Sequence, residues 1–106
     1  MTDHRLIREF FLGFIKIHIL YHAAQAPVCG VDLGEELARH GYHVSPGTLY
    51  PTLHALERAG YLQRESRTVH GRRRKYYCAT GDGRSVLQRA RKQACELLDE
   101  IVENDG

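Results

Sequence analysis

Apolar residues recur at helical spacing in the first quarter of the chain and predict a long helix from about residue 5 to 24. One face of this helix carries Leu6 and Phe10, and a second face carries Phe11 and Ile15. A helix that is apolar nearly all round must be buried nearly all round. In so short a chain, one face can meet the protein's own core while the other meets a second molecule. We therefore expect Phe11 and Ile15 to contribute to a dimer interface.

A second, shorter helix is predicted up to about His40. Asp32, with Glu35 three residues later, is typical of a capping box, although a start one turn earlier, near Cys29, also fits the pattern. Gly41 occupies the place where a left-handed residue would end the helix.

The third helix is predicted to begin after Ser45, an N-cap residue type, and to end at Gly60. Pro46 takes the first helical position, which proline favours. Pro51 is unusual, because a proline beyond the first turn removes a backbone donor and crowds the carbonyl of Gly47. A strained helix start of this kind suggests that close fit to a partner matters more here than helix stability.

The hydrophobic period changes after this helix, and residues 61–69 and 75–79 predict two strands. The turn between them is expected around His70 and Gly71, with three arginines on its far side. Helical periodicity returns from Asp82 onward. Apolar residues of this last helix follow the spacing of a pairing helix, and those predicted to form a dimer seam are Leu87, Ala90, Ala94, Leu97, Leu98 and Ile101.

The predicted order is therefore three helices, a hairpin and a final helix, which is the order of a winged helix. The expected fold class is mainly α (α+β), a winged helix-turn-helix with a two-stranded wing and a C-terminal dimerisation helix. We expect residues 1–80 to form the DNA-binding domain, including the N-terminal helix, and residues 81–106 to form the dimerisation helix.

Composition agrees with a small globular domain: 106 residues, of which 42% are hydrophobic and 26% charged. Lys16, His18 and His22 interrupt the most apolar stretch before it reaches membrane-spanning length, so a cytoplasmic protein is expected. Its three cysteines lack CxxC spacing and are expected to be free thiols. We recognise no nucleophile motif and no phosphate-binding loop, so the sequence does not indicate an enzyme, and it indicates no cofactor.

Positive charge is concentrated in the predicted hairpin, where residues 61–79 contain six basic residues and one acidic residue. Cations at a hairpin tip can follow DNA phosphates. The N-terminal end of the third helix would enter the major groove and offer free amides and hydroxyls. The residues predicted to contact double-stranded DNA are Ser45, Pro46, Gly47, Thr48, Tyr50, Pro51, Arg58, Arg64, Arg67, Arg72, Arg73, Arg74, Lys75 and Tyr76.

Four motifs in this order resemble the PadR family of bacterial transcriptional repressors. They are SPGTLYP (residues 45–51), LERAG (56–60), GRRRKYY (71–77) and TGDG (80–83). The resemblance implies a homodimer that binds inverted-repeat DNA, with the last helix pairing across the dimer. It also implies repression that a small molecule or another signal relieves.

Other hypotheses remain beside this one. His18 and His22 lie one turn apart and could hold a metal ion, either across a dimer axis or together with Cys29, although two histidines at an interface edge are the simpler interpretation. Oxidation of Cys78 could disturb the wing. A winged helix that binds only proteins is a further alternative, but it would not need so basic a hairpin.

Overall fold

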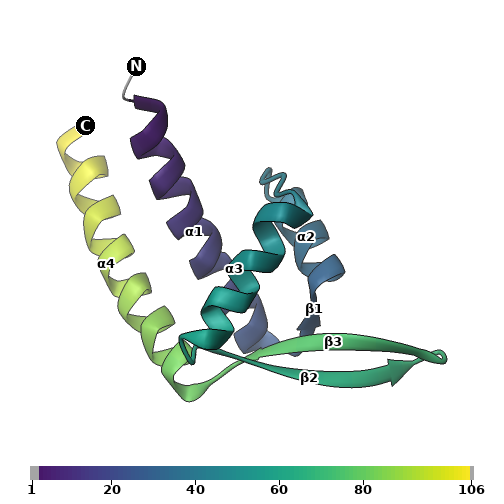
Figure 1. Cartoon of the computed structure of the whole chain (residues 1–106). Coiled ribbons are helices and arrows are strands. Elements are labelled where there is room, and N and C mark those ends of the chain that lie inside the picture. The colour runs from purple at the N-terminus through teal and green to yellow at the C-terminus, as the bar shows by residue number, and fades with distance from the viewer. Residues whose placement is uncertain (1–2, 106) are drawn as a thin grey trace.

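The computed structural model describes residues 3–105 and shows the predicted mainly helical fold with a small antiparallel sheet. In chain order the elements are α1 (Asp3–Gln25), β1 (Val28–Cys29), α2 (Gly30–Arg39), α3 (Pro46–Arg58), β2 (Leu62–Val69), β3 (Arg72–Ala79) and α4 (Gly81–Asp105). Helices α1 and α4 run side by side, and the β2–β3 hairpin projects from the helices as a wing (Figure 1). Residues 1, 2 and 106 of the two predicted domains lie outside the described part.

One hydrophobic core joins α1, α2, α3 and the base of the wing. Leucines at helical spacing on α2 and α3 pack against a single face of α1, and β2 and β3 each add one side chain at the wing base. The buried residues of this cluster are Ile15, Ile19, Leu20, Ala23, Leu33, Leu37, Leu49, Leu53, Leu56, Leu62 and Tyr77. Because α3 is anchored along its whole inner face, its outer face is held in a fixed orientation beside the wing.

The wing is a hairpin whose two strands pair from Leu62 with Ala79 to Val69 with Arg72. His70 and Gly71 form its two-residue loop and both have positive φ, as the favoured tight hairpin turn requires. The turn is where the sequence predicted it. The second strand, however, begins at Arg72 rather than at Lys75, because the three arginines pair with β2 instead of belonging to the loop.

A third, short strand was not predicted. The two residues of β1 pair with β3, so the sheet has the order β1-β3-β2. This pairing ties the start of α2 to the base of the wing. A strand of two residues carries too few side chains to show any alternation in a sequence.

The helix boundaries agree with prediction, and of the two predicted starts of α2 the earlier one, near Cys29, is found. The helix begins at Gly30, with Cys29 in the N-cap position and no side-chain cap, so the capping box at Asp32 is not formed. Asp32 lies within the first turn, where its negative charge suits the helix dipole. Gly41 and Gly60 both have positive φ just beyond α2 and α3, as expected for helix-ending glycines.

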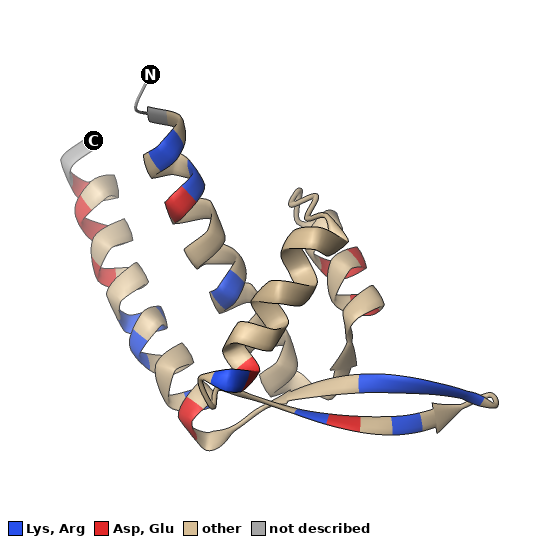
Figure 2. Cartoon of the chain, in the orientation of Figure 1, with Lys and Arg blue, Asp and Glu red and all other residues tan. Residues whose placement is uncertain are grey.

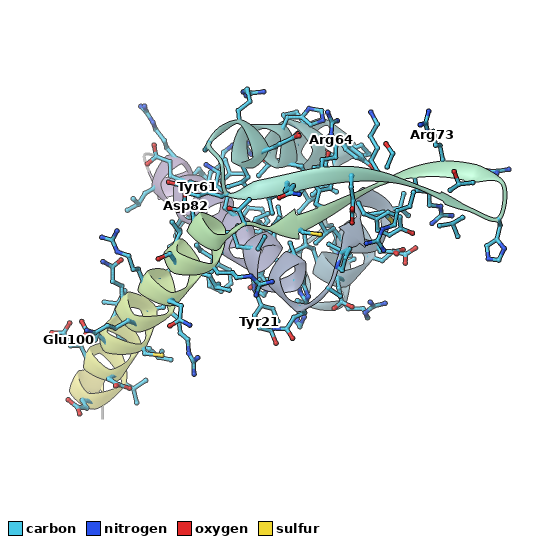
Figure 3. All side chains as sticks on the ribbon, turned by 90° about the horizontal axis from the view of Figure 1, so that it is seen from below. Tyr21, Tyr61, Arg64, Arg73, Asp82 and Glu100 are labelled. Carbon is cyan, nitrogen blue, oxygen red and sulfur yellow. The ribbon has the colours of Figure 1, made fainter. Side chains whose placement is uncertain are left out.

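The wing and α4 meet at a tight junction. The Thr80 backbone amide donates to the carbonyl of Tyr61 at 3.1 Å, and the Thr80 hydroxyl donates to the carbonyl of Gly60 at 2.6 Å. The same hydroxyl oxygen accepts a hydrogen bond of 3.0 Å from the Gly83 amide and so caps α4. Tyr61 and Asp82 are neighbours at this junction in Figure 3.

None of the described helices combines the length and the apolar character that crossing a membrane requires.

Candidate nucleic-acid interface

The exposed start of α3 is small and uncharged. Ser45, Pro46 and Gly47 are exposed, and Thr48 is half-buried. Ser45 occupies the N-cap position, but its hydroxyl caps no backbone amide and lies 3.4 Å from the Thr48 hydroxyl instead. A helix start without a side-chain cap leaves backbone donors and the positive end of the helix dipole for another partner.

Pro51 lies inside α3, on its exposed side, and deprives the Gly47 carbonyl of its usual helical donor. Thr52 next to it donates its hydroxyl to the carbonyl of Thr48 at 2.7 Å, which adds a side-chain bond in this first turn. The helix therefore tolerates its internal proline on a face where no protein packs. This exposed face of α3 therefore has room for the backbone of a binding partner to approach closely.

Tyr50 has a structural contact that the sequence did not indicate. Its ring lies directly over Gly30, where an added Cβ would stand only 2.6 Å from a ring carbon. The side chain is nevertheless 36% exposed, so its outer edge faces solvent. This ring fixes the distance between the start of α2 and the outer face of α3.

The register of the wing divides its cations between two faces. Residues that face each other across the hairpin share a side, and neighbours along a strand alternate. Arg64, Arg73 and Lys75 therefore lie on one face, and Arg67, Arg72 and Arg74 lie on the other. Figure 3 shows Arg64 and Arg73 on the same side of the hairpin. The same alternation separates the two tyrosines of β3, because Tyr77 is buried and Tyr76 is half-buried.

Two of the predicted DNA contacts already have partners within the protein. Arg64 forms an ion pair of 3.5 Å with Glu57 of α3 and lies beside the buried phenol of Tyr77. Burial raises the pKa of Tyr77, and the charge of Arg64 acts in the opposite direction. Arg67 pairs with Glu65 at 2.6 Å and lies 5.3 Å from the Tyr76 ring centre, within cation–π range.

The other wing cations are exposed, and none of the ion pairs between described residues involves them: Arg72, Arg73, Arg74 and Lys75. Figure 2 shows this positive charge along the wing, whereas acidic residues mark the end of α4 near the C-terminus. Arg58 at the end of α3 is exposed as well. The opening of α3 and the distal wing thus form a surface of small polar groups beside uncompensated positive charge, which we call the α3–wing surface.

A second exposed surface is apolar and lies on α1 and α4. The large exposed hydrophobic side chains of these two helices are Leu6, Ile7, Phe10, Phe14, Tyr21, Leu97, Leu98, Ile101 and Val102. The start of α1 and the end of α4 lie at the same end of the molecule (Figure 1). Many large apolar side chains exposed on two neighbouring helices are typical of a protein interface. We call this surface the α1–α4 apolar patch.

The structure corrects part of the predicted dimer surface. Ile15 is only 1% exposed and belongs to the chain's own core, so it is not available to a second molecule. Phe11 is half-buried against that core and lies 5.6 Å from the Tyr42 ring. Leu87 and Ala90 are also half-buried, whereas Ala94, Leu97, Leu98 and Ile101 are exposed. The apolar face of α1 that is exposed to solvent is the one that carries Leu6 and Phe10.

The remaining candidate residues are separated. Cys29 is buried, Cys78 is half-buried and Cys95 is exposed on α4, and no disulfide joins them. His22 approaches Glu36 and His40 of α2, two residues that the sequence pattern did not bring together with it. Helical spacing in the sequence places Glu36 and His40 one turn apart. Their approach to His22 could not be predicted, because it depends on how α2 packs on α1.

Comparisons with known proteins identify a family. A family profile described as "Transcriptional regulator PadR-like family" matches residues 19–89. The transcriptional regulator Rv3488 of Mycobacterium tuberculosis is 51% identical over 96 residues, which cover 91% of this chain and 90% of the relative. Among solved structures, a PadR-like transcription factor from Bacteroides fragilis has a TM-score of 0.78 at 27% identity, covering 96% of this chain and 99% of that one. A PadR-like transcriptional regulator from Bacillus cereus has a TM-score of 0.76 at 31% identity, covering 87% and 90%.

Proposed function

The chain belongs to the PadR-like family of transcriptional regulators, and on this premise we propose that it binds double-stranded DNA sequence-specifically as a homodimer. We further propose that it represses transcription until a signal releases it. The observation that carries the proposal is the α3–wing surface. It combines an exposed, uncapped helix start with four wing cations that have no ion-pair partner among the described residues.

The two parts of this surface would have different roles. The first turns of α3 would enter the major groove, where Thr48, Tyr50 and the backbone around Gly47 can reach base edges or phosphates. The wing cations would bind the adjacent phosphates and add affinity that depends on salt but not on sequence. Arg64 would act indirectly, because its ion pair with Glu57 orients the wing relative to α3, whereas Arg67 pairs with Glu65 within β2.

Dimerisation is supported by the α1–α4 apolar patch. Leu97, Leu98 and Ile101 are each more than half exposed at the end of α4, and Leu6 and Phe10 are exposed at the nearby start of α1. Burying side chains of this size contributes about 1.5–3 kcal/mol for each one that is fully covered. A second copy of the chain would cover the patch and place two α3–wing surfaces on one duplex.

A small-molecule signal would have a place to bind beside this patch. An open groove of about 690 Å³ lies between α1 and α4, with Phe14, Ile17, Tyr21 and Leu87 among its lining residues. Its volume falls within the range of roughly 300–1,000 Å³ that is usual for small-ligand sites. A ligand in this groove would touch both helices of the proposed interface.

The test is fluorescence anisotropy with a labelled duplex from the protein's own upstream region, measured beside a scrambled duplex over a series of salt concentrations. We expect tighter binding to the upstream duplex and a steep decrease in affinity with salt. Weak and equal binding to the two duplexes would show that the upstream region does not contain the operator, and other duplexes would then have to be searched. Absence of binding to any duplex at low salt would contradict the proposal and favour a winged helix that binds proteins.

A further inference from the structure

Three polar side chains from α1 and α2 converge at a place that the DNA-binding proposal does not use. The imidazoles of His22 and His40 and the carboxylate of Glu36 offer nitrogen and oxygen atoms that all lie within 4.8 Å of one another. Glu36 and His40 are one helical turn apart at the end of α2, and His22 faces them from the last turns of α1. His18, one turn earlier on α1, has its ring centre 5.4 Å from that of His40.

The Nε2 atom of His22 is buried and has no hydrogen-bond partner among the described residues. A buried polar atom that has lost water without gaining a partner carries a cost in free energy. Such atoms are rare in folded proteins and call for an explanation. A ligand that accepts the lone pair of this nitrogen would remove the cost.

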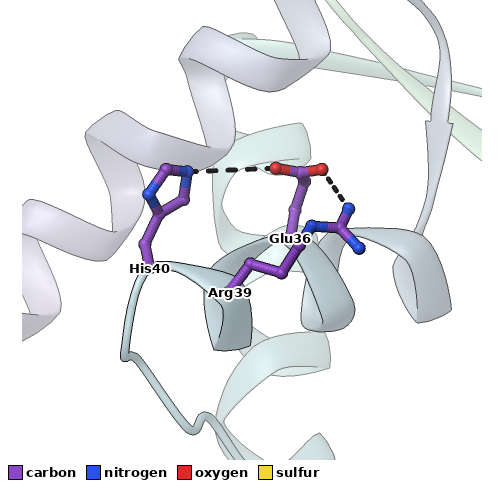
Figure 4. Close-up of polar contacts among 3 residues, drawn as sticks. All are labelled: Glu36, Arg39 and His40. Carbon is purple, nitrogen blue, oxygen red and sulfur yellow. Dashed lines mark hydrogen bonds and ion pairs between the residues drawn. The ribbon is translucent and has the colours of Figure 1, made fainter.

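The Glu36 carboxylate is already oriented for such a ligand (Figure 4). One of its oxygens, Oε1, accepts a hydrogen bond from Arg39, while the other, Oε2, faces His40 Nε2 at 3.9 Å. This second contact is too long for a hydrogen bond. Two atoms that bind the same tetrahedral zinc ion at about 2.1 Å lie roughly 3.4 Å apart, so a shift of about 0.5 Å would bring this pair to the spacing of zinc ligands. Arg39 would then fix the carboxylate from behind, as outer groups commonly do at metal sites.

The charge states of these groups also suit a cation. Burial is the main cause that lowers the pKa of both His18 and His22, and the neighbouring His40 lowers both further. For His22, Glu36 acts in the opposite direction. The hydrogen bond from Arg39 lowers the pKa of Glu36, so this carboxyl group is ionised at neutral pH. Metal ions bind neutral imidazole and ionised carboxylate.

From this geometry we propose that His22, Glu36 and His40 form a binding site for a divalent first-row transition metal ion such as Zn²⁺. Two imidazole nitrogens and one carboxylate oxygen suit zinc, and exclude magnesium or calcium, which prefer all-oxygen sites. Rotation of the His40 side chain, which is half exposed, closes the ligands around the ion. Water or His18 takes the fourth position. The site lies within one chain, so it does not require the symmetry-related histidines that the sequence suggested.

The test is titration of the metal-free protein with zinc chloride, followed by isothermal calorimetry and equilibrium dialysis. We expect one ion per chain. His22→Gln and Glu36→Gln should each weaken binding by at least as much as the roughly 10–100-fold loss caused by removing an outer-shell partner. His4→Gln changes an exposed histidine at the other end of α1 and should bind zinc like the original protein.

Two further measurements separate loss of the site from loss of the fold. Circular dichroism of each variant without metal should match the original protein. Glu36→Gln keeps an oxygen acceptor for Arg39 and is not fully buried, so this variant is expected to fold even if His22→Gln does not. Cobalt(II) in place of zinc should give absorption bands typical of nitrogen and oxygen ligands. No binding, binding that both variants retain, or a thiolate-to-cobalt band from one of the cysteines would overturn the proposal.

Discussion

At the scale of single residues, the backbone of Gly83 lies very close to the backbone of Tyr61. A Cβ at this position would lie 2.2 Å from the carbonyl oxygen of Tyr61, a contact that no alanine could adopt without a backbone shift. The Thr80 hydroxyl and the Tyr61 carbonyl hold the same junction together through hydrogen bonds. Glycine is therefore required at this position because a side chain would not fit, and not because the backbone has a positive φ.

Gly83→Ala should lower the stability of the protein by roughly 1–3 kcal/mol, which is the usual cost of overfilling a packed site. Gly81→Ala is the matched control, because nothing lies within 4 Å of a Cβ built there. Thermal and urea unfolding of both variants at one protein concentration would measure the difference. Equal midpoints for the two variants would mean that the junction relaxes freely.

The sequence supplied the identities of the candidate DNA-binding residues but not their surroundings. The exposure of Gly47 could be predicted from helix spacing, because leucines at helical spacing in α3 occupy the opposite, inward face. The ion pair of Arg64 with Glu57 and the position of Tyr50 over Gly30 could not, because each joins two elements whose relative placement only the folded chain defines. His22 with Glu36 and His40 was missed for the same reason.

At the scale of elements, the alternation of side chains along the wing has a consequence for DNA binding. Arg73 lies on the face of the hairpin that carries Arg64, the partner of α3, whereas Arg72 lies on the opposite face. Both are exposed and have no ion pair with a described residue. They are adjacent residues on opposite sides of the wing, so they form a matched pair of positions.

Under the proposed function, Arg73→Ala should weaken binding to all duplexes alike and reduce the salt slope by about one, as loss of one phosphate contact does. Arg72→Ala should have the smaller effect, because its side chain starts on the face away from α3. Anisotropy with the upstream and scrambled duplexes measures both variants. If Arg73→Ala weakened binding only to the upstream duplex, its role would be base recognition and not phosphate binding.

The elements themselves were largely predictable, and the exceptions have physical causes. Four helices and the hairpin follow from periodicity and from glycine and proline positions. The two-residue β1 is defined only by its pairing with β3. The face of α1 that is buried could not be decided from the sequence, because both of its long faces are apolar, and this is why Ile15 was assigned to the wrong surface.

At the scale of the whole molecule, the polar and apolar surfaces are separated. The α3–wing surface and the end of the molecule formed by the start of α1 and the end of α4 lie far apart in Figure 1. The molecule extends 55 Å along its long axis and 32 and 24 Å along the others. A partner that covers the α1–α4 apolar patch would therefore leave the wing accessible.

Leu97→Glu tests whether that partner is a second copy of the chain. We expect the original protein to have twice its chain mass of 12.1 kDa in light-scattering chromatography and the variant to have the single mass. A buried unpaired carboxylate is too costly to be accommodated in an apolar interface. Ser85→Glu adds the same charge at an exposed position early in α4 and should remain a dimer. A monomeric original protein, or a dimeric Leu97→Glu variant, would contradict the proposed interface.

The junction at Thr80 and Gly83 connects the wing to α4, so a rotation of α4 at this junction would move the wing with it. Eight residues of strand extend about 27 Å at the usual rise of roughly 3.4 Å per residue. A rotation of about 10° at the junction would then move the hairpin tip by nearly 5 Å, more than the roughly 3.4 Å that one base pair occupies along the axis of a DNA duplex. In the proposed dimer, a small change in the angle at which the two α4 helices cross would thus change which phosphates the wing can reach.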